Sequence, residues 1–96
     1  MVNYKHEPEN NRVAAYIDDG TEVGKITYIP VGDVWDANHT FVHTDYRGGP
    51  IARELLKLLV EKAREEGKGI HPTCEYVDKV MDKVVEYHDV LRRELP

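Results

Sequence analysis

The sequence contains a single cysteine and no long apolar run. Cys74 on its own excludes a disulfide within the chain and fits a reducing cytoplasm. No apolar stretch approaches the roughly 20 residues that a bilayer span requires, and Met1 to Asn10 lacks the apolar segment of a signal peptide. These absences predict a cytoplasmic protein without a membrane partner.

Positive charge is also scarce. The 13 Lys and Arg are outnumbered by 18 Asp and Glu, which leaves a net charge of -5 spread along the chain. Binding to nucleic acid requires a basic face, so the composition argues against nucleic acid as the main partner. An acidic composition does not exclude one local basic pocket. The five histidines and one cysteine lack the spacing of a ligand set, so we predict no metal site.

The chain has 96 residues, of which 41% are hydrophobic and 32% are charged. This length allows one hydrophobic core, and the composition is that of a globular protein. No repeat or Pro/Gly/Ser linker divides the sequence, so residues 1–96 are predicted to form a single domain whose site is a surface cleft.

The first half of the chain has the patterns of strands. Strands are expected at Arg12–Ile17, Val23–Val31 and Val34–Val42, with a short first strand at Tyr4–His6. The Gly32-Asp33 turn predicts an antiparallel hairpin. Strict alternation predicts that one face of the first hairpin strand carries Val23, Thr27, Ile29 and Val31. It predicts that one face of the second strand carries Trp35, Ala37, His39 and Phe41.

The second half changes to helical spacing. Apolar residues predict a helix over Pro50–Glu66, with Pro50 at its first position, and a second helix that begins at Glu75 and continues through Leu91. A short strand at Gly69–Pro72 lies between them. The helical crossover favours parallel pairing, so we predict an α+β fold with a mixed sheet, in which two parallel strands splay apart to form a cleft.

The stretch Arg47-Gly48-Gly49 leads from a strand into this first helix. Glycines allow backbone N–H groups to approach a ligand closely, and a helix N-terminus favours an anion such as a pyrophosphate. Glycines before a helix also form ordinary turns, so the loop alone leaves both interpretations open.

The loop and four other motifs, taken together, resemble the small GNAT-like N-acetyltransferases. The Arg47-Gly48-x-x-Ile51-Ala52 segment is similar to their coenzyme A loop. The other motifs follow the family order: Gly24-Lys25-Ile26-Thr27-Tyr28, His39-Thr40-x-Val42, Pro72-x-Cys74-x-Tyr76-Val77 and Glu86-Tyr87-x-Asp89-Val90. The resemblance covers residues 20 to 91 and implies an acetyl-CoA-dependent transfer of an acetyl group to an amine acceptor that the sequence does not identify.

The resemblance also implies which residues bind acetyl-CoA. Backbone amides around Gly48, Gly49, Ile51 and Ala52 would hold the pyrophosphate, and the strand edge Phe41-Val42-His43 would pair with the pantetheine arm. Arg47 would add positive charge. The family pattern has Gly at the position of Pro50, which lacks an N–H, so this proline either preorganises the helix or weakens coenzyme A binding.

Two residues are candidates for catalysis. Cys74 lies near the start of the last helix, where a thiolate is stabilised, and the resemblance implies a position near the acetyl group. A lone cysteine is also often a small buried apolar residue. His39 is a candidate proton acceptor or a sheet residue. Two further functions remain open: a coenzyme A or acyl-CoA binding module with little catalysis, and a protein-interaction domain that uses the long C-terminal helix.

Overall fold

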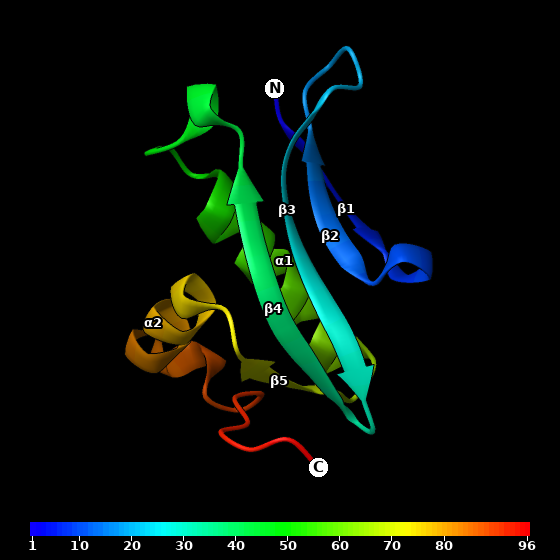
Figure 1. Ribbon diagram of the computed structural model, residues 1–96, viewed down its shortest axis with the longest axis vertical. Helices are drawn as coiled ribbons and strands as arrows, with labels where there is room; N and C mark the ends of the chain where they lie inside the picture. Colours follow the sequence, from blue (N-terminus) through cyan, green and yellow to red (C-terminus); the bar gives the residue numbers. More distant parts are fainter.

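The computed structural model describes residues 1–96 and has an α+β fold built on a five-stranded mixed sheet (Figure 1). The strand order is β1-β2-β3-β4-β5; the strands from β1 to β4 pair antiparallel, and β4 pairs parallel with β5. The predicted fold class is confirmed. The elements are β1 Asn3–Glu7, η1 Pro8–Asn10, β2 Arg12–Tyr16, β3 Glu22–Val31, β4 Val34–Val42, η2 Thr44–Tyr46, α1 Ile51–Glu65, β5 Gly69–Pro72, α2 Glu75–Lys83 and η3 Val85–Tyr87.

Helix α1 covers one face of the sheet and contacts all five strands. Full burial of an aliphatic side chain contributes roughly 1.5–3 kcal/mol, so this apolar face fixes the helix on the sheet. The opposite face of β1 to β4 carries no helix (Figure 1). Neither helix combines the length and the apolar character that a membrane span requires. The buried residues of α1 are Ile51, Leu55, Leu56, Leu59, Val60 and Ala63.

Gly24 of β3 brings the start of α1 close to the sheet. A Cβ atom at this glycine would lie 2.9 Å from Cγ2 of Ile51 and 3.1 Å from the carbonyl oxygen of Phe41. Only a glycine therefore fits between the first turn of α1 and the end of β4. This close approach places the helix N-terminus beside the last residues of β4.

A β-bulge in β4 changes which side chains face α1. Thr27 pairs with His39 and Tyr28 pairs with Ala37, so Asn38 is an extra residue on β4. A one-residue bulge reverses the alternation of the strand beyond it. Ala37 is therefore buried, whereas His39 and Phe41 are exposed, and the prediction that these residues share one face is wrong.

A second irregularity affects the prediction for β3. Ala15 pairs with Gly24 and Tyr16 pairs with Glu22, which leaves Val23 without a partner across β2. The residues that face the core are Gly24, Ile26 and Tyr28, together with the bulged Val23. Thr27, Ile29 and Val31 point away from α1 because they belong to the other parity, and Ile29 is half exposed.

The C-terminal helix is shorter than predicted. Helix α2 ends at Lys83, and the chain then forms η3 and returns to β5, where Leu91 makes a parallel bridge to Ile70. Tertiary contacts stabilise this return: Val90 is buried, and Arg64 of α1 forms an ion pair with Asp89 at 2.8 Å. No residue in the sequence breaks the helix, so the prediction failed because these contacts outweigh local helix propensity.

His6 of β1 predicts a loss of stability in mild acid. Its imidazole contacts the hydroxyl of Tyr28 at 2.7 Å, and burial lowers the pKa of His6, opposed by the nearby Glu66. Because the folded protein holds this proton less tightly than the unfolded chain, His6 contributes stability above a pH of about 6.5 and loses it as pH falls. Urea unfolding at pH 7 and pH 5 should show lower stability at pH 5.

The variant His6→Gln is the matched control for this prediction. Glutamine keeps a hydrogen-bonding group near Tyr28 and does not titrate in this range. The difference in unfolding free energy between pH 7 and pH 5 should become smaller in His6→Gln. An unchanged difference assigns the pH dependence to other groups.

Candidate functional site

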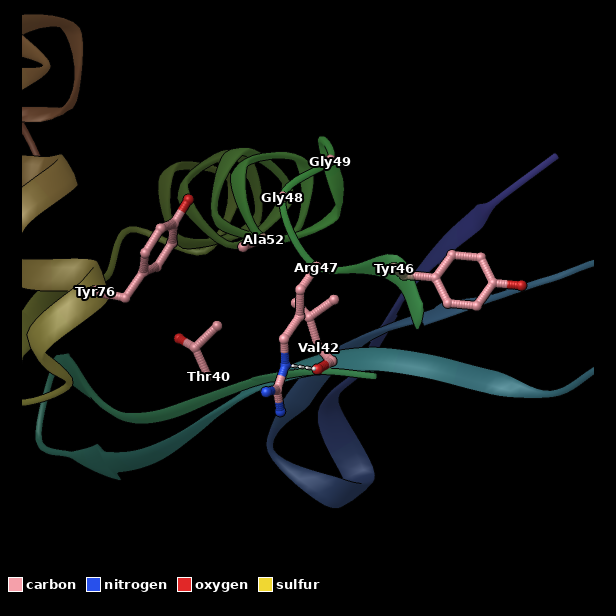
Figure 2. Close-up of a pocket in the computed structure, with 8 residues that line it drawn as sticks. All are labelled: Thr40, Val42, Tyr46, Arg47, Gly48, Gly49, Ala52 and Tyr76. Atoms are coloured by element: carbon pink, nitrogen blue, oxygen red, sulfur yellow. Dashed lines mark hydrogen bonds between the residues drawn. The ribbon is translucent and has the colours of Figure 1, made fainter. Parts of the chain in front are cut away.

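A hollow opens where β4 and β5 separate. The last backbone hydrogen bond between these segments runs from the Cys74 N–H to the carbonyl oxygen of Ala37, at 2.8 Å. Beyond this bond, β4 continues toward η2, while the segment that follows β5 enters α2 (Figure 1). The hollow has a volume of about 250 Å³ and is lined by Thr40, Val42, Tyr46, Arg47, Gly48, Gly49, Ala52 and Tyr76 (Figure 2).

The edge of β4 that faces the hollow carries backbone groups of alternate residues. His43 donates its N–H to the carbonyl oxygen of Val23, toward β3. Neighbouring residues of a strand direct their backbone groups to opposite sides, so Val42 and Thr40 direct theirs toward the hollow. The hydrogen bond from Nε of Arg47 to the carbonyl oxygen of Val42 agrees with this direction. The hollow therefore has a strand edge along one wall.

The other wall is the loop before α1, which is rich in unused donors. The backbone N–H groups of Gly48, Gly49, Ile51, Ala52 and Arg53 donate no hydrogen bond within the protein. Gly48 has a φ of +85°, a conformation that favours glycine, and no atom would contact a Cβ there within 4 Å. These donors lie at the N-terminus of a 15-residue helix, whose dipole adds positive potential.

Six of the predicted site residues come together in this region. Val42, Arg47, Gly48, Gly49 and Ala52 line the hollow. Ile51 has a buried side chain, so only its backbone N–H is available. Pro50 precedes α1 as its N-cap rather than as its first helical residue, and its carbonyl oxygen accepts the N–H of Glu54.

The structure does not bring His39, Phe41 or His43 into the hollow. The bulge at Asn38 turns His39 and Phe41 to the face of the sheet that α1 leaves uncovered. His43 lies at the start of η2, where its Nδ1 accepts the N–H of Asp45. Of the predicted strand edge, Val42 therefore lines the hollow, together with Thr40, which the prediction did not include.

Cys74 lies behind the lining of the hollow. It is the N-cap of α2 and is partly buried, with its Sγ 3.3 Å from Oγ1 of Thr40. This contact joins β4 to the start of α2 at the point where the two strands separate. Cys74 therefore reaches the hollow through Thr40, without lining it directly.

Tyr76 is a residue of the hollow to which the sequence analysis gave no role. It lies in the first turn of α2, and its hydroxyl group has no hydrogen-bond partner in the protein. Figure 2 shows its ring on the wall opposite Arg47. Burial raises the pKa of Tyr76, opposed by the positive charge of Arg53. One signal was present: Tyr76 belongs to the motif Pro72-x-Cys74-x-Tyr76-Val77.

The positive charge at the hollow comes from side chains on the loop and on the first turn of α1. Arg47 lines the hollow and forms no ion pair with a carboxylate. The lining itself contains no Asp or Glu. The structure contains no group of three or more His, Cys, Asp or Glu side chains that could hold a metal ion. This arrangement suits an anionic group at the loop and a neutral segment along β4.

Solved structures with the same fold include a GCN5-like N-acetyltransferase candidate from Staphylococcus aureus. It is 27% identical, with a TM-score of 0.72 over 94% of this chain and 87% of that protein. Ribosomal-protein-alanine N-acetyltransferase from Brucella melitensis biovar Abortus 2308 matches at 24% identity and a TM-score of 0.62, over 76% of this chain and 59% of its own. Nourseothricin acetyltransferase matches at 29% identity and a TM-score of 0.54, over 69% and 42% respectively.

Curated proteins provide no match to the chain. A protein-family model described as GCN5-related N-acetyl-transferase matches residues 12–90, from the start of β2 to the buried Val90. This match includes the strand edge, the loop and both helices that form the hollow. The chain belongs to the family of GCN5-related N-acetyltransferases.

Proposed function

We propose that residues 1–96 form a single domain that binds acetyl-CoA and transfers its acetyl group to an amine. The observation that carries this proposal is the set of free backbone N–H groups at Gly48, Gly49, Ile51 and Ala52, next to an unpaired strand edge. Family membership makes acetyl-CoA the expected acyl donor. A cytoplasmic location, suggested by the lone cysteine, stays a prediction.

The residues present fit acetyl-CoA in two parts. The loop amides and the α1 dipole suit its pyrophosphate. The strand edge at Thr40 and Val42 suits the amides of the pantetheine arm, as in β-strand addition. The acyl end would then lie near Thr40, Cys74 and Tyr76, where the hollow meets α2.

Bound acetyl-CoA would supply an activated thioester; the protein would orient it and provide a proton for the departing sulfur. Tyr76 has a free hydroxyl group and a raised pKa, so it keeps its proton at neutral pH and can donate it to the departing sulfur. No residue that lines the hollow is a base at neutral pH. We therefore expect the amine to lose its proton to water before it attacks the carbonyl carbon.

One observation favours a second candidate, a coenzyme A binding module with little catalysis. Pro50 interrupts the row of loop amides, because it has no N–H. The third candidate, an interaction domain, was based on a long C-terminal helix, and this helix ends at Lys83.

Acetyl-CoA titration of ¹⁵N-labelled protein tests the proposed function. Amide signals from Val42 to Ala52 and from Thr73 to Tyr76 should shift far more than those from Arg12 to Tyr28. Shifts confined to the hairpin of β2 and β3, or no shifts at millimolar acetyl-CoA, contradict the proposal. Release of free thiol in the presence of a panel of amines then separates an enzyme from a binding module.

The variant Pro50→Gly measures how much the missing N–H of Pro50 weakens coenzyme A binding. Glycine adds a backbone N–H, and a hydrogen bond to a charged group contributes roughly 1.5–3 kcal/mol, so coenzyme A should bind about tenfold more tightly. Glycine also loosens the first turn and the unfolded chain, which lowers stability by up to about 1 kcal/mol. Calorimetry with coenzyme A and thermal unfolding measure the two effects separately. Unchanged or weaker affinity shows that the proline is no defect.

Alkylation of Cys74 measures how close its thiol lies to the acyl site. Cys74 is the only cysteine and is partly buried, so iodoacetamide should react with it slowly but completely. A saturating concentration of coenzyme A should slow the reaction at least about threefold, since its arm would cover the Thr40 side of the thiol. Mass spectrometry over time gives both rates. Equal rates with and without coenzyme A place the thiol outside the site.

A further inference from the structure

Arg47 occupies a backbone acceptor on the strand edge that faces the hollow. Its Nε donates a hydrogen bond of 2.8 Å to the carbonyl oxygen of Val42. Figure 2 shows the side chain descending from the loop to the strand along the wall of the hollow, with this hydrogen bond at its end. Val42 and Thr40 each direct a backbone N–H and a carbonyl toward the hollow, so the arginine occupies one of the two carbonyl acceptors on this strand edge.

No carboxylate holds the Arg47 guanidinium in this position. Its hydrogen bond to Val42 is supplemented only by the ring of Phe41, whose centroid lies 6.0 Å away. Arg47 is exposed, so water competes for both partners of this hydrogen bond and its net contribution is small. The contact is therefore weak enough for a ligand to replace, yet it must be broken before the carbonyl can accept a new donor.

We propose that Arg47 is a specificity-determining residue that makes the protein select thioesters of coenzyme A over thioesters of pantetheine. The inference rests on the proposed function, because it assigns the loop to a diphosphate and the strand edge to the arm. A ligand with a diphosphate at the loop gives the displaced guanidinium a new anionic partner, since Arg47 directly precedes Gly48. Neutral pantetheine breaks the contact with Val42 and offers nothing in exchange.

The coupling follows from this exchange of partners. The guanidinium is ionised in both positions, but a phosphate adds an attraction between opposite charges that a neutral carbonyl lacks, so the move of Arg47 from a carbonyl to a phosphate favours binding. Coenzyme A therefore gains from Arg47, and pantetheine loses from it. The two ligands share the same arm, so the difference in how one substitution affects them isolates this coupling.

The variant Arg47→Met tests the inference. Methionine keeps an unbranched side chain against Phe41 and removes both the charge and the donor. We expect pantetheine to bind about fivefold more tightly to Arg47→Met than to the natural protein, and coenzyme A about tenfold more weakly. The selectivity ratio should therefore fall about fiftyfold. Calorimetry with each compound at low salt gives the four dissociation constants.

The variant Arg53→Met is the control for charge. Arg53 is exposed in the first turn of α1 and makes no hydrogen bond through its side chain, so this change removes the same charge without freeing Val42. We expect Arg53→Met to weaken the binding of coenzyme A, because a long-range attraction is lost, and to leave the binding of pantetheine unchanged. Tighter pantetheine binding in both variants assigns the effect to net charge and overturns the inference.

The remaining outcomes separate this inference from the proposed function. Pantetheine binding that is unchanged or weaker in Arg47→Met overturns the role of Arg47, even where coenzyme A binds the natural protein well. Tighter pantetheine binding in Arg47→Met, combined with no coenzyme A binding to either protein, supports the blocked strand edge but contradicts the selection and the diphosphate loop. Failure of both compounds to bind either protein overturns the inference and the proposed function together.

Discussion

A carboxylate at position 52 should weaken coenzyme A binding at least about 100-fold while leaving the fold intact. Ala52 lies in the first turn of α1, lines the hollow and is only partly buried, so Ala52→Asp places a negative charge beside the loop amides. Two unit charges about 5 Å apart near a protein surface repel by roughly 3 kcal/mol. The affinity for coenzyme A should therefore fall at least about 100-fold.

The same substitution should have little effect on stability. Aspartate has a lower helix propensity than alanine by about 0.5 kcal/mol, and a negative charge in the first helical turn returns about 0.3–1 kcal/mol through the dipole. Thermal unfolding should change by only a few degrees. A loss of affinity without a loss of stability is specific to an anion site and differs from the signature of a misfolded loop.

Val85→Asp provides the matched control. Val85 is 71% exposed at the start of η3, outside the lining of the hollow, so this variant has the same change in net charge. Coenzyme A should bind Val85→Asp as it binds the natural protein. Equal weakening in both variants contradicts a local phosphate site, and full affinity in Ala52→Asp removes the loop from the binding site altogether.

The elements with uninterrupted periodicity could be predicted from the sequence. The apolar residues of α1, from Ile51 to Ala63, have the spacing of a helix and of no other element. The observed bounds of α1 lie within one residue of the predicted ones. The hairpin turn at Gly32-Asp33 joins β3 and β4 as expected, and the helical crossover gives the predicted parallel pairing with β5. In these cases local propensity and tertiary packing favour the same structure.

The faces of β3 and β4 could not be predicted, because they depend on register. A bulge inserts one residue, and the pattern of β4 reads equally well with or without an extra residue at Asn38. That one residue moves His39 away from the hollow and Thr40 toward it. The sequence therefore predicted the wrong face of β4 for His39 and Phe41, although it placed the strand itself correctly.

The loop was identified through its glycines, and the opposite wall of the hollow was not. Gly48 has a positive φ, which glycine adopts more readily than other residues, so the residue type itself indicated a tight loop at this position. Tyr76 has no such signature, because a tyrosine in the first turn of a helix is equally at home in a core or in water. Its role depends on the separation of β4 from β5, a tertiary feature that brings residues 40 and 76 to the same hollow.

Removal of the hydroxyl oxygen of Tyr76 should slow the proposed acetyl transfer without weakening the binding of coenzyme A. The hydroxyl group has no partner in the protein, so Tyr76→Phe breaks no internal hydrogen bond and keeps the ring against the core. General acid catalysis typically contributes 10²–10⁴-fold, so kcat should fall at least about 100-fold if Tyr76 protonates the departing sulfur. The dissociation constant of coenzyme A should stay within about twofold, because the loop and the strand edge are untouched.

The control for this variant is Tyr4→Phe. Tyr4 of β1 is also a partly buried tyrosine with a pKa raised by burial, and it lies outside the hollow. Thiol release from acetyl-CoA with a panel of amines should be slow in Tyr76→Phe and normal in Tyr4→Phe. Because the raised pKa keeps Tyr76 protonated through the neutral range, the proposed transfer should lose no rate from this group between pH 7 and pH 9. Equal rates in the two variants remove Tyr76 from the proton transfer and leave the thiolate of coenzyme A to depart unassisted.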